Sequence, residues 1–291
     1  MFEVTDLGEP SKIVRIEINI DPKTGNIKLT QKKYIKRLLQ KYSLVDANGV
    51  AVPMDPNIKF DLPNGKGDRS NSYVSLVGSL MFIAVATRPD IAYAVNRLAM
   101  YTANPDLHHW TTAKRVLQYL SGMQSEGITY LAEGDTEVKI TGYSDASLAS
   151  LDDMTSVSGY VFLVAGGAIT WRSKKQTAIS LLSTEAEYIS LADAARKATW
   201  LRNLYNELGF EITEPTLIYG DNQSALAIAS NPQYHKRTKH FNIKHHYIRE
   251  KVNDQLIVTE YCPTAEMMAD ILTKPLPKPK FNQHKVELGV S

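Results

Sequence analysis

The N-terminal part of the chain alternates apolar and polar positions with the period of a half-buried β-strand. This alternation runs over residues 13–20 and is followed at 21–26 by a turn that contains Pro22 and Gly25. A second short apolar stretch, residues 27–29, is the expected partner strand. The chain is therefore predicted to open with a short β-hairpin.

Helical spacing replaces this alternation from residue 31 onward. In the stretch 31–42, Tyr34, Leu38 and Leu39 recur at intervals that place them on one face of a helix. Further helices are predicted at residues 73–86, 90–103 and 107–123. Residues 1–134 are thus expected to form a smaller, α-rich segment that carries no cluster of reactive side chains.

Residues 135–291 follow a different pattern, in which short strands alternate with helices. A long helix over 183–208, ended by Gly209, follows three strands at 138–144, 158–164 and 168–172. A strand, two helices, a strand and a last helix are then expected at 216–219, 222–229, 241–253, 256–261 and 264–272. The prolines that follow are expected to end the regular structure; they are Pro275, Pro277 and Pro279. This order predicts an α/β fold with a mixed sheet flanked by helices.

The composition is that of an ordinary globular protein, with 43% hydrophobic and 22% charged residues. The length of 291 residues suggests two domains or one large one. A single cysteine, Cys262, excludes an intrachain disulfide, and the longest apolar run, residues 76–86, is too short for a membrane helix. No signal peptide is recognisable at the N-terminus. We therefore expect an intracellular protein that is not secreted and has no membrane partner.

The net charge is only +2, but the basic residues are concentrated in one segment. Between residues 231 and 251 lie six Lys or Arg, four of the seven histidines and a single acid, Glu250. Such a concentration is typical of a site for a polyanion such as nucleic acid. A solvated helix face is the alternative, and the composition alone does not separate the two.

Four carboxylates stand where the predicted fold could bring them together. Asp145 and Asp221 each follow a predicted strand, and open α/β sheets bind ligands beyond the carboxyl ends of their strands. Glu187 lies in the first turn of the long helix, and Asp270 lies within the otherwise apolar last helix. Crowded carboxylates repel one another unless hard cations such as Mg²⁺ neutralise them. Two such ions can hydrolyse a phosphodiester, which makes a metal-dependent nuclease one interpretation.

Each of these acids also has a purely structural interpretation. Asp145 could close a turn, and Asp221 could cap the helix that follows it. Glu187 could complete a capping box with Thr184, and Asp270 could be solvated on the outer face of its helix. Taken one at a time, the acids favour these structural roles.

Seven short motifs run in order through the second segment and change this weighting. They are Tyr143-Ser144-Asp145-Ala146, Thr155-Ser156-Val157-Ser158-Gly159-Tyr160-Val161-Phe162, Trp171-Arg172-Ser173-Lys174-Lys175-Gln176, Leu182-Ser183-Thr184-Glu185-Ala186-Glu187-Tyr188, Tyr219-Gly220-Asp221-Asn222-Gln223-Ser224-Ala225, Arg237-Thr238-Lys239-His240 and Ala269-Asp270-Ile271-Leu272-Thr273-Lys274-Pro275-Leu276. In this order and at this spacing they resemble the ribonuclease H domain of copia-type LTR retrotransposon polyproteins.

The first segment resembles the same polyproteins, in the stretch between the polymerase palm and the nuclease. The matching residues are Asp6-Leu7-Gly8, Ile27-Lys28-Leu29-Thr30-Gln31, Leu76-Val77-Gly78-Ser79-Leu80, Ala86-Thr87-Arg88-Pro89-Asp90-Ile91-Ala92 and Ala113-Lys114-Arg115-Val116-Leu117. The resemblance therefore covers nearly the whole chain. It implies a thumb- and connection-like remnant of a reverse transcriptase over residues 1–134 and a ribonuclease H-like domain over residues 135–291.

The resemblance also implies a set of metal ligands. By motif, Asp145, Glu187, Asp221 and Asp270 correspond to an Asp-Glu-Asp-Asp quartet that binds two Mg²⁺ ions, with Mn²⁺ as an alternative metal. Glu185 is the competing residue for the second position. Glu187 is preferred because it precedes a tyrosine as the glutamate of the family does, and because its helix face also carries apolar residues that point to the sheet.

The implied reaction is two-metal hydrolysis of the RNA strand of an RNA–DNA hybrid. The residues expected to bind the nucleic acid are Lys236, Arg237, Lys239 and His240. The polymerase motif Tyr-x-Asp-Asp of such proteins is expected upstream of residue 1, so we expect no polymerase activity here and name the upstream polymerase part as a partner. The resemblance places the protein in the cytoplasm, within a virus-like particle, or in the nucleus.

Departures from the family pattern keep a second hypothesis open. Leu148 and Ser150 stand where a Trp and a Gly are common, and Met154 and Thr155 stand where basic residues are usual. None of these changes removes an acid of the quartet. An active ribonuclease H is the leading interpretation, and a catalytically inactive nucleic-acid-binding remnant is the alternative. A DDE transposase of related fold ranks below both, because its catalytic glutamate would lie on a late helix.

Overall fold

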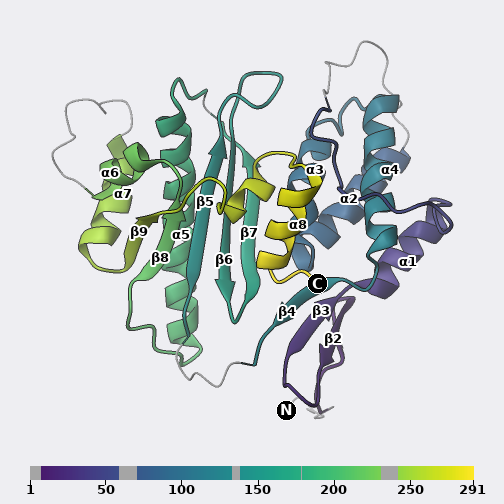
Figure 1. Cartoon of the computed structure of the whole chain (residues 1–291), viewed down its shortest axis with the longest axis horizontal. Helices are drawn as coiled ribbons and strands as arrows, with labels where there is room; N and C mark the ends of the chain where they lie inside the picture. The colour runs from purple at the N-terminus through teal and green to yellow at the C-terminus, as the bar shows by residue number, and fades with distance from the viewer. Residues whose placement is uncertain (1–7, 59–70, 133–137, 178, 231–241) are drawn as a thin grey trace, which may run out of the picture.

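Two β-sheets organise the chain, and helices pack on and between them (Figure 1). The computed structural model describes residues 8–58, 71–132, 138–177, 179–230 and 242–291. One sheet has four strands in the order β1-β2-β3-β4, and the other has five in the order β7-β6-β5-β8-β9. Within the described part of the chain, no helix is long and apolar enough to cross a membrane.

The four-stranded sheet is built around the predicted hairpin and is antiparallel throughout. Its strands are β1 Lys12–Ile13, β2 Ile16–Ile20, β3 Ile27–Thr30 and β4 Gly127–Tyr130. The single strand expected over 13–20 is wrong, because Val14 and Arg15 adopt left-handed conformations (φ 45° and 64°) that interrupt it. The sequence did not predict β4, since four residues are too few to show a period.

Within its described residues, the first segment also contains four helices and one short 3₁₀ turn. They are α1 Lys32–Lys41, α2 Asn71–Ala86, η1 Pro89–Ile91, α3 Ala92–Ala99 and α4 Leu107–Gly122. The helix expected at 90–103 is therefore shorter than predicted. Helix α4 begins with a capping box in which the Asp106 carboxylate accepts from the His109 backbone N–H at 2.9 Å.

The five-stranded sheet is mixed. Its strands are β5 Thr141–Ser147, β6 Val157–Val164, β7 Gly167–Lys175, β8 Thr216–Gly220 and β9 Ile257–Tyr261. Strands β5, β8 and β9 run parallel to one another, whereas β6 and β7 pair antiparallel. This arrangement confirms the α/β class and the mixed sheet that the sequence predicts.

Three helices cover one face of this sheet (Figure 1). They are α5 Ser183–Glu207, α6 Gln223–Ser230 and α7 Asn242–Asn253. The core beneath them includes Tyr160 and Phe162 of β6, whereas Val161 between them belongs to the core on the opposite face. Gly209 follows α5 with φ of 85°, which confirms its predicted role at the end of the helix.

The C-terminal part differs from the expectation. The helix expected over 264–272 is a 3₁₀ turn, η3 Met268–Leu272, and the prolines do not end the regular structure. A further helix, α8 Lys278–Glu287, starts after Pro277 and carries Pro279 in its first turn. Proline is tolerated there because the first N–H groups of a helix have no partner within it.

Helix α8 lies between the sheet and the helices of the first segment (Figure 1). One continuous hydrophobic core contains residues of both segments, among them Leu120 of α4, Val161 of β6 and Phe281 of α8. The last residues return to the small sheet, where Val290 forms a bridge to Ile128. The predicted boundary at residues 134 and 135 falls outside the described residues, but the packing of the two segments is continuous.

Candidate active site

Three of the four predicted acids meet at one edge of the five-stranded sheet. Asp145 lies in β5, Asp221 directly follows β8, and Glu187 lies in the first turns of α5. Strands β5 and β8 are parallel and place Ser144 opposite Gly220, so the two aspartates leave neighbouring strands at the same level. Each of the three acids offers an oxygen that lies within 4.8 Å of the other two.

The two glutamates of α5 have different environments. Glu185 accepts a hydrogen bond from the Leu181 backbone N–H at 2.9 Å and thus bonds the start of its own helix. Glu187 faces the sheet instead, where the Ala146 backbone N–H donates to it. The capping box with Thr184 is absent, because the N-cap residue of α5 is Leu182 and the helix has no side-chain cap hydrogen bond. The structure therefore brings Glu187, and not Glu185, to the two aspartates.

Asp270 lies beside this group and is not part of it. Its carboxylate is fully buried and is paired at 2.6 Å with Lys274 through Oδ1 and at 2.6 Å with Lys280 through Oδ2. Asp270 is nevertheless close enough to raise the pKa of Asp145 by charge repulsion. The structure thus places the fourth predicted acid at the same edge, with its charge compensated by two lysines.

The acid group carries more negative charge than its surroundings balance. Burial, reinforced by Asp270 and Asp221, raises the pKa of Asp145 to about 7, although Lys274 and a hydrogen bond from the Thr273 hydroxyl oppose the shift. Burial and then the Asp145 and Asp221 charges raise the pKa of Glu187 well above its ordinary value. Both shifts show that the ionised forms are disfavoured in the absence of a cation.

Short hydrogen bonds and close packing hold the acids in place. The Ser190 hydroxyl of α5 donates to the Asp145 carbonyl at 2.8 Å and joins the helix to the strand. Gly159 of β6 allows η3 to approach, because a Cβ there would lie 2.7 Å from Thr273 Cγ2. The Thr264 hydroxyl donates to Asp221 Oδ2 at 2.8 Å. The site is therefore supported from the helix, the sheet and the C-terminal segment.

This donor set fits a divalent cation. Carboxylate oxygens are the ligands that Mg²⁺ and Mn²⁺ prefer, and the three clustered groups are all carboxylates. A cation would offset the burial and the charge repulsion that together raise the pKa values of Asp145 and Glu187. Asp145, Glu187 and Asp221 are the residues that would hold it.

No model of a protein family matches the chain. The chain is 36% identical over 297 residues to the retrovirus-related Pol polyprotein from transposon TNT 1-94 of Nicotiana tabacum, covering 99% of the chain and 22% of that protein. It is 38% identical over 292 residues to the Pol polyprotein from transposon RE1 of Arabidopsis thaliana, covering 100% of the chain and 20% of that protein. The chain belongs to the copia-type Pol polyproteins. It spans about a fifth of the length of these relatives.

Among solved structures, this Pol segment is similar to the N-terminal ribonuclease H domain of a Mycobacterium tuberculosis protein. The TM-score is 0.33 at 14% identity, and the match covers 52% of this chain and 98% of that chain. The five-stranded mixed sheet and its helices have the α/β architecture that the sequence predicts for residues 135–291.

The residues predicted to bind nucleic acid, Lys236, Arg237, Lys239 and His240, lie outside the described residues. Two other basic residues of the same sequence segment have structural contacts. Arg249 donates through Nε to the Ile228 carbonyl at 3.0 Å, and Lys251 pairs with Glu250 at 2.7 Å. These contacts give Arg249 and Lys251 a structural role at the surface that does not involve nucleic acid.

Four residues at the acid site of this Pol segment received no role from the sequence: Thr264, Thr273, Lys274 and Lys280. Lys274 stands four residues after Asp270, a spacing at which opposite charges pair on one helical face, so its contact could have been found. Lys280 reaches Asp270 from a separate helix, and no local pattern predicts that contact.

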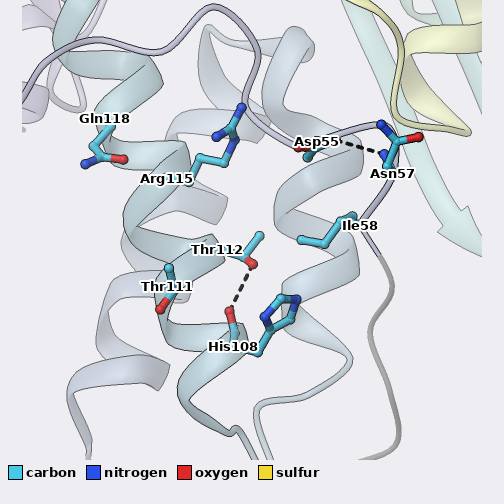
Figure 2. A pocket seen from close by; sticks show the side chains of 8 residues that line it. All are labelled: Asp55, Asn57, Ile58, His108, Thr111, Thr112, Arg115 and Gln118. Carbon is cyan, nitrogen blue, oxygen red and sulfur yellow. Dashed lines mark hydrogen bonds between the residues drawn. The ribbon is translucent and has the colours of Figure 1, made fainter.

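A cavity of about 410 Å³ lies in the first segment (Figure 2). It lies between the stretch 55–58 and one face of α4, and its lining residues are Asp55, Asn57, Ile58, His108, Thr111, Thr112, Arg115 and Gln118. Asp55 accepts from the Asn57 backbone N–H at 2.9 Å, and the Thr112 hydroxyl donates to the His108 carbonyl at 2.9 Å. None of the four predicted acids lines this cavity.

Proposed function

We propose that this chain is the ribonuclease H of a copia-type retrotransposon and hydrolyses the RNA strand of RNA–DNA hybrids with two divalent metal ions. The observation that carries the proposal is the group of Asp145, Glu187 and Asp221 oxygens within 4.8 Å of one another, on a ribonuclease H-like sheet. Kinship with the Pol polyproteins supports the choice of a hybrid substrate. Mg²⁺ is the proposed metal, with Mn²⁺ as the alternative.

In this proposal Asp145, Glu187 and Asp221 bind the metal, and Asp270 is the fourth acid. Two bound ions would supply an activated water and stabilise the leaving 3′ oxygen. Burial and then the charges of Asp145 and Asp221 raise the pKa of Glu187, so a metal bound at this carboxylate would displace its proton. The two Asp270 oxygens pair with different lysines. A metal that took the place of Lys274 at Oδ1 would therefore leave the contact of Oδ2 with Lys280 intact.

The proposal assigns substrate binding to the basic segment, with phosphate contacts from Lys236, Arg237, Lys239 and His240. Lys274, whose side chain is one-third exposed beside the acids, adds positive charge that favours a phosphate at the same edge. We further propose that residues 1–134 are the thumb- and connection-like part of the reverse transcriptase. The upstream polymerase part would be a partner, in a cytoplasmic virus-like particle or in the nucleus.

Cleavage of a hybrid with a labelled RNA strand tests the proposal directly. The full chain should shorten the labelled strand only when Mg²⁺ or Mn²⁺ is present, and should leave the same RNA intact when it is single-stranded. Asp145→Asn, purified in parallel, should lower the rate by at least about a hundredfold, which excludes a contaminating nuclease. Equal cleavage by this variant, or cleavage in a chelator, would overturn the proposal.

A catalytically inactive nucleic-acid-binding remnant is the second candidate. The observation that favours it is the pairing of both Asp270 oxygens with lysines, which leaves three acids in the group. This candidate predicts that the hybrid is retarded in a gel-shift assay while its RNA strand stays intact with either metal.

A further inference from the structure

Lys280, in the first turn of α8, joins two segments that approach the acid site. Its ammonium group lies 2.6 Å from Asp270 Oδ2 in η3 and 2.8 Å from the Thr264 carbonyl in the loop after β9. The Asp270 carboxylate is fully buried, and the Lys280 side chain is partly buried. A single side chain thus fixes the distance between η3 and the loop.

Both of these segments contact the acid group directly. Thr264 donates its hydroxyl to Asp221 Oδ2 at 2.8 Å, and Thr273, directly after η3, donates its hydroxyl to Asp145 Oδ2. The missing side chain at Gly159 lets Thr273 and Leu272 pack close to β6, because a Cβ there would lie within 3 Å of both. A change at Lys280 would therefore reach Asp221 through Thr264, and Asp145 through Asp270 and Thr273.

The other side of α8 is anchored on the first segment. The Phe281 ring packs edge-on against Tyr119 of α4, with ring centres 5.7 Å apart. Lys285 binds both oxygens of Glu126 at 2.9 Å. The end of the chain pairs with β4, where the Ser291 N–H donates to the Gly127 carbonyl at 3.1 Å. The position of Lys280 is thus set by the first segment.

We propose that Lys280 is a positioning residue that couples the docking of α8 on the first segment to the geometry of the acid site. The inference rests on the proposed metal-dependent function. It assigns Lys280 no contact with substrate or metal. Its effect passes through Thr264 to Asp221 and through Asp270 and Thr273 to Asp145.

The test compares Lys280→Met, Lys280→Arg and the control Lys278→Met, which removes an exposed lysine of the same helix. Supporting groups around metal ligands typically change affinity or activity by about 10–100-fold. We expect Lys280→Met to lower kcat for the hybrid by about tenfold at saturating Mg²⁺, with KM within about twofold. Lys280→Arg should restore most of the rate, and Lys278→Met should match the wild type.

Mn²⁺ binding to the protein alone, followed by electron paramagnetic resonance, gives a second readout without cleavage. Positioning predicts that Lys280→Met binds Mn²⁺ at least about threefold more weakly and that Lys280→Arg recovers. If Lys280 were only a counter-charge, its loss would make the acids more negative and tighten Mn²⁺ binding. Tighter binding, or values equal to those of Lys278→Met, would overturn the inference.

A second variant covers the case in which Lys280→Met does not fold. Thr264 is exposed, so Thr264→Val removes one hydroxyl while keeping the fold. The inference predicts that Thr264→Val lowers kcat and weakens Mn²⁺ binding, as Lys280→Met does, but by a smaller factor. Unchanged values would contradict the inference. The proposed function itself would be refuted by a different result. In that result the wild type does not cleave the hybrid, and any Mn²⁺ binding it shows is unchanged in Asp145→Asn.

Discussion

Asparagine in place of Asp145 would keep the shape of this side chain and remove its charge. Asp145 is 2% exposed, and burial together with the charges of Asp270 and Asp221 raises its pKa to about 7. The amide oxygen can still accept the Thr273 hydroxyl. We therefore expect the metal-free variant to be more stable than the wild type at pH values above 7. Cleavage should be lost, because a neutral amide is a poor ligand for a hard cation.

The magnitude follows from the shift in the pKa of Asp145. Its ordinary value is 3.8 and its value in the fold is about 7, which corresponds to about 4 kcal/mol at about 1.4 kcal/mol per unit. The new amide N–H, if it finds no acceptor, costs about 1–3 kcal/mol. The net gain in the free energy of unfolding is then about 1–3 kcal/mol.

The sign of the pH dependence is also fixed. Because the pKa of Asp145 is raised in the fold, the folded protein holds more protons than the unfolded chain between pH 3.8 and about 7. The stability of the wild type should therefore fall as the pH rises through this window, and the variant should lack this contribution. Above the folded pKa both states are ionised, and the difference stays constant.

Urea denaturation in a chelator, at about pH 5 and about pH 8, measures both effects. Asp153→Asn is the matched control, since hydrogen bonds from Lys175 and Thr155 lower the pKa of Asp153 to about 2, and its loss should destabilise the fold. An Asp145→Asn protein less stable than the wild type at about pH 8 would refute the reasoning. So would a wild type whose stability does not fall between the two pH values.

Two further predictions concern the choice of residues. Glu187→Gln should lower hybrid cleavage by about a hundredfold or more, whereas Glu185→Gln should cost about 1 kcal/mol of stability or less and leave cleavage unchanged; equal losses of cleavage would contradict the assignment. Replacing Lys236, Arg237 and Lys239 together by alanine should weaken hybrid binding and reduce the log–log salt slope by about 0.7–0.9 for each phosphate that the variant no longer neutralises. A slope equal to that of the wild type would favour the alternative interpretation, in which these residues form a solvated surface.

The acids whose positions could be predicted are those on regular elements with a clear period. Asp145 and Asp221 stand at the ends of apolar stretches, and the parallel pairing of β5 with β8 brings such ends together. The orientation of Glu187 toward the sheet could be predicted from its spacing to buried residues of the same helix. The contacts that Thr264 and Lys280 make at the site lay beyond this reasoning, because both residues reach it from segments distant in sequence.

The C-terminal segment shows why the rest could not be predicted. Its apolar residues 267–269, 271 and 272 suggested one helix, but the structure has a 3₁₀ turn whose side chains are buried by strands and helices distant in sequence. Pro275 and Pro277 precede α8, and Pro279 stands in its first turn, where proline is compatible with a helix. A proline in the sequence predicts the end of a helix, but it does not indicate whether a new helix begins after it.

In the inferred role of Lys280, the first segment acts on the acid site through the contacts that anchor α8 on it. Arg88 and Asp90 are both fully buried and form two hydrogen bonds, at 2.9 and 2.7 Å, and the Tyr119 hydroxyl donates to the same Asp90 carboxylate at 2.6 Å. Removing one partner of such a buried network typically costs about 3–5 kcal/mol, so the position of the Tyr119 ring is strongly fixed. Phe281 packs on that ring, and Lys280 is its neighbour on α8. The buried ion pair of the first segment thus supports Lys280 through one aromatic contact, made by the residue next to it on α8.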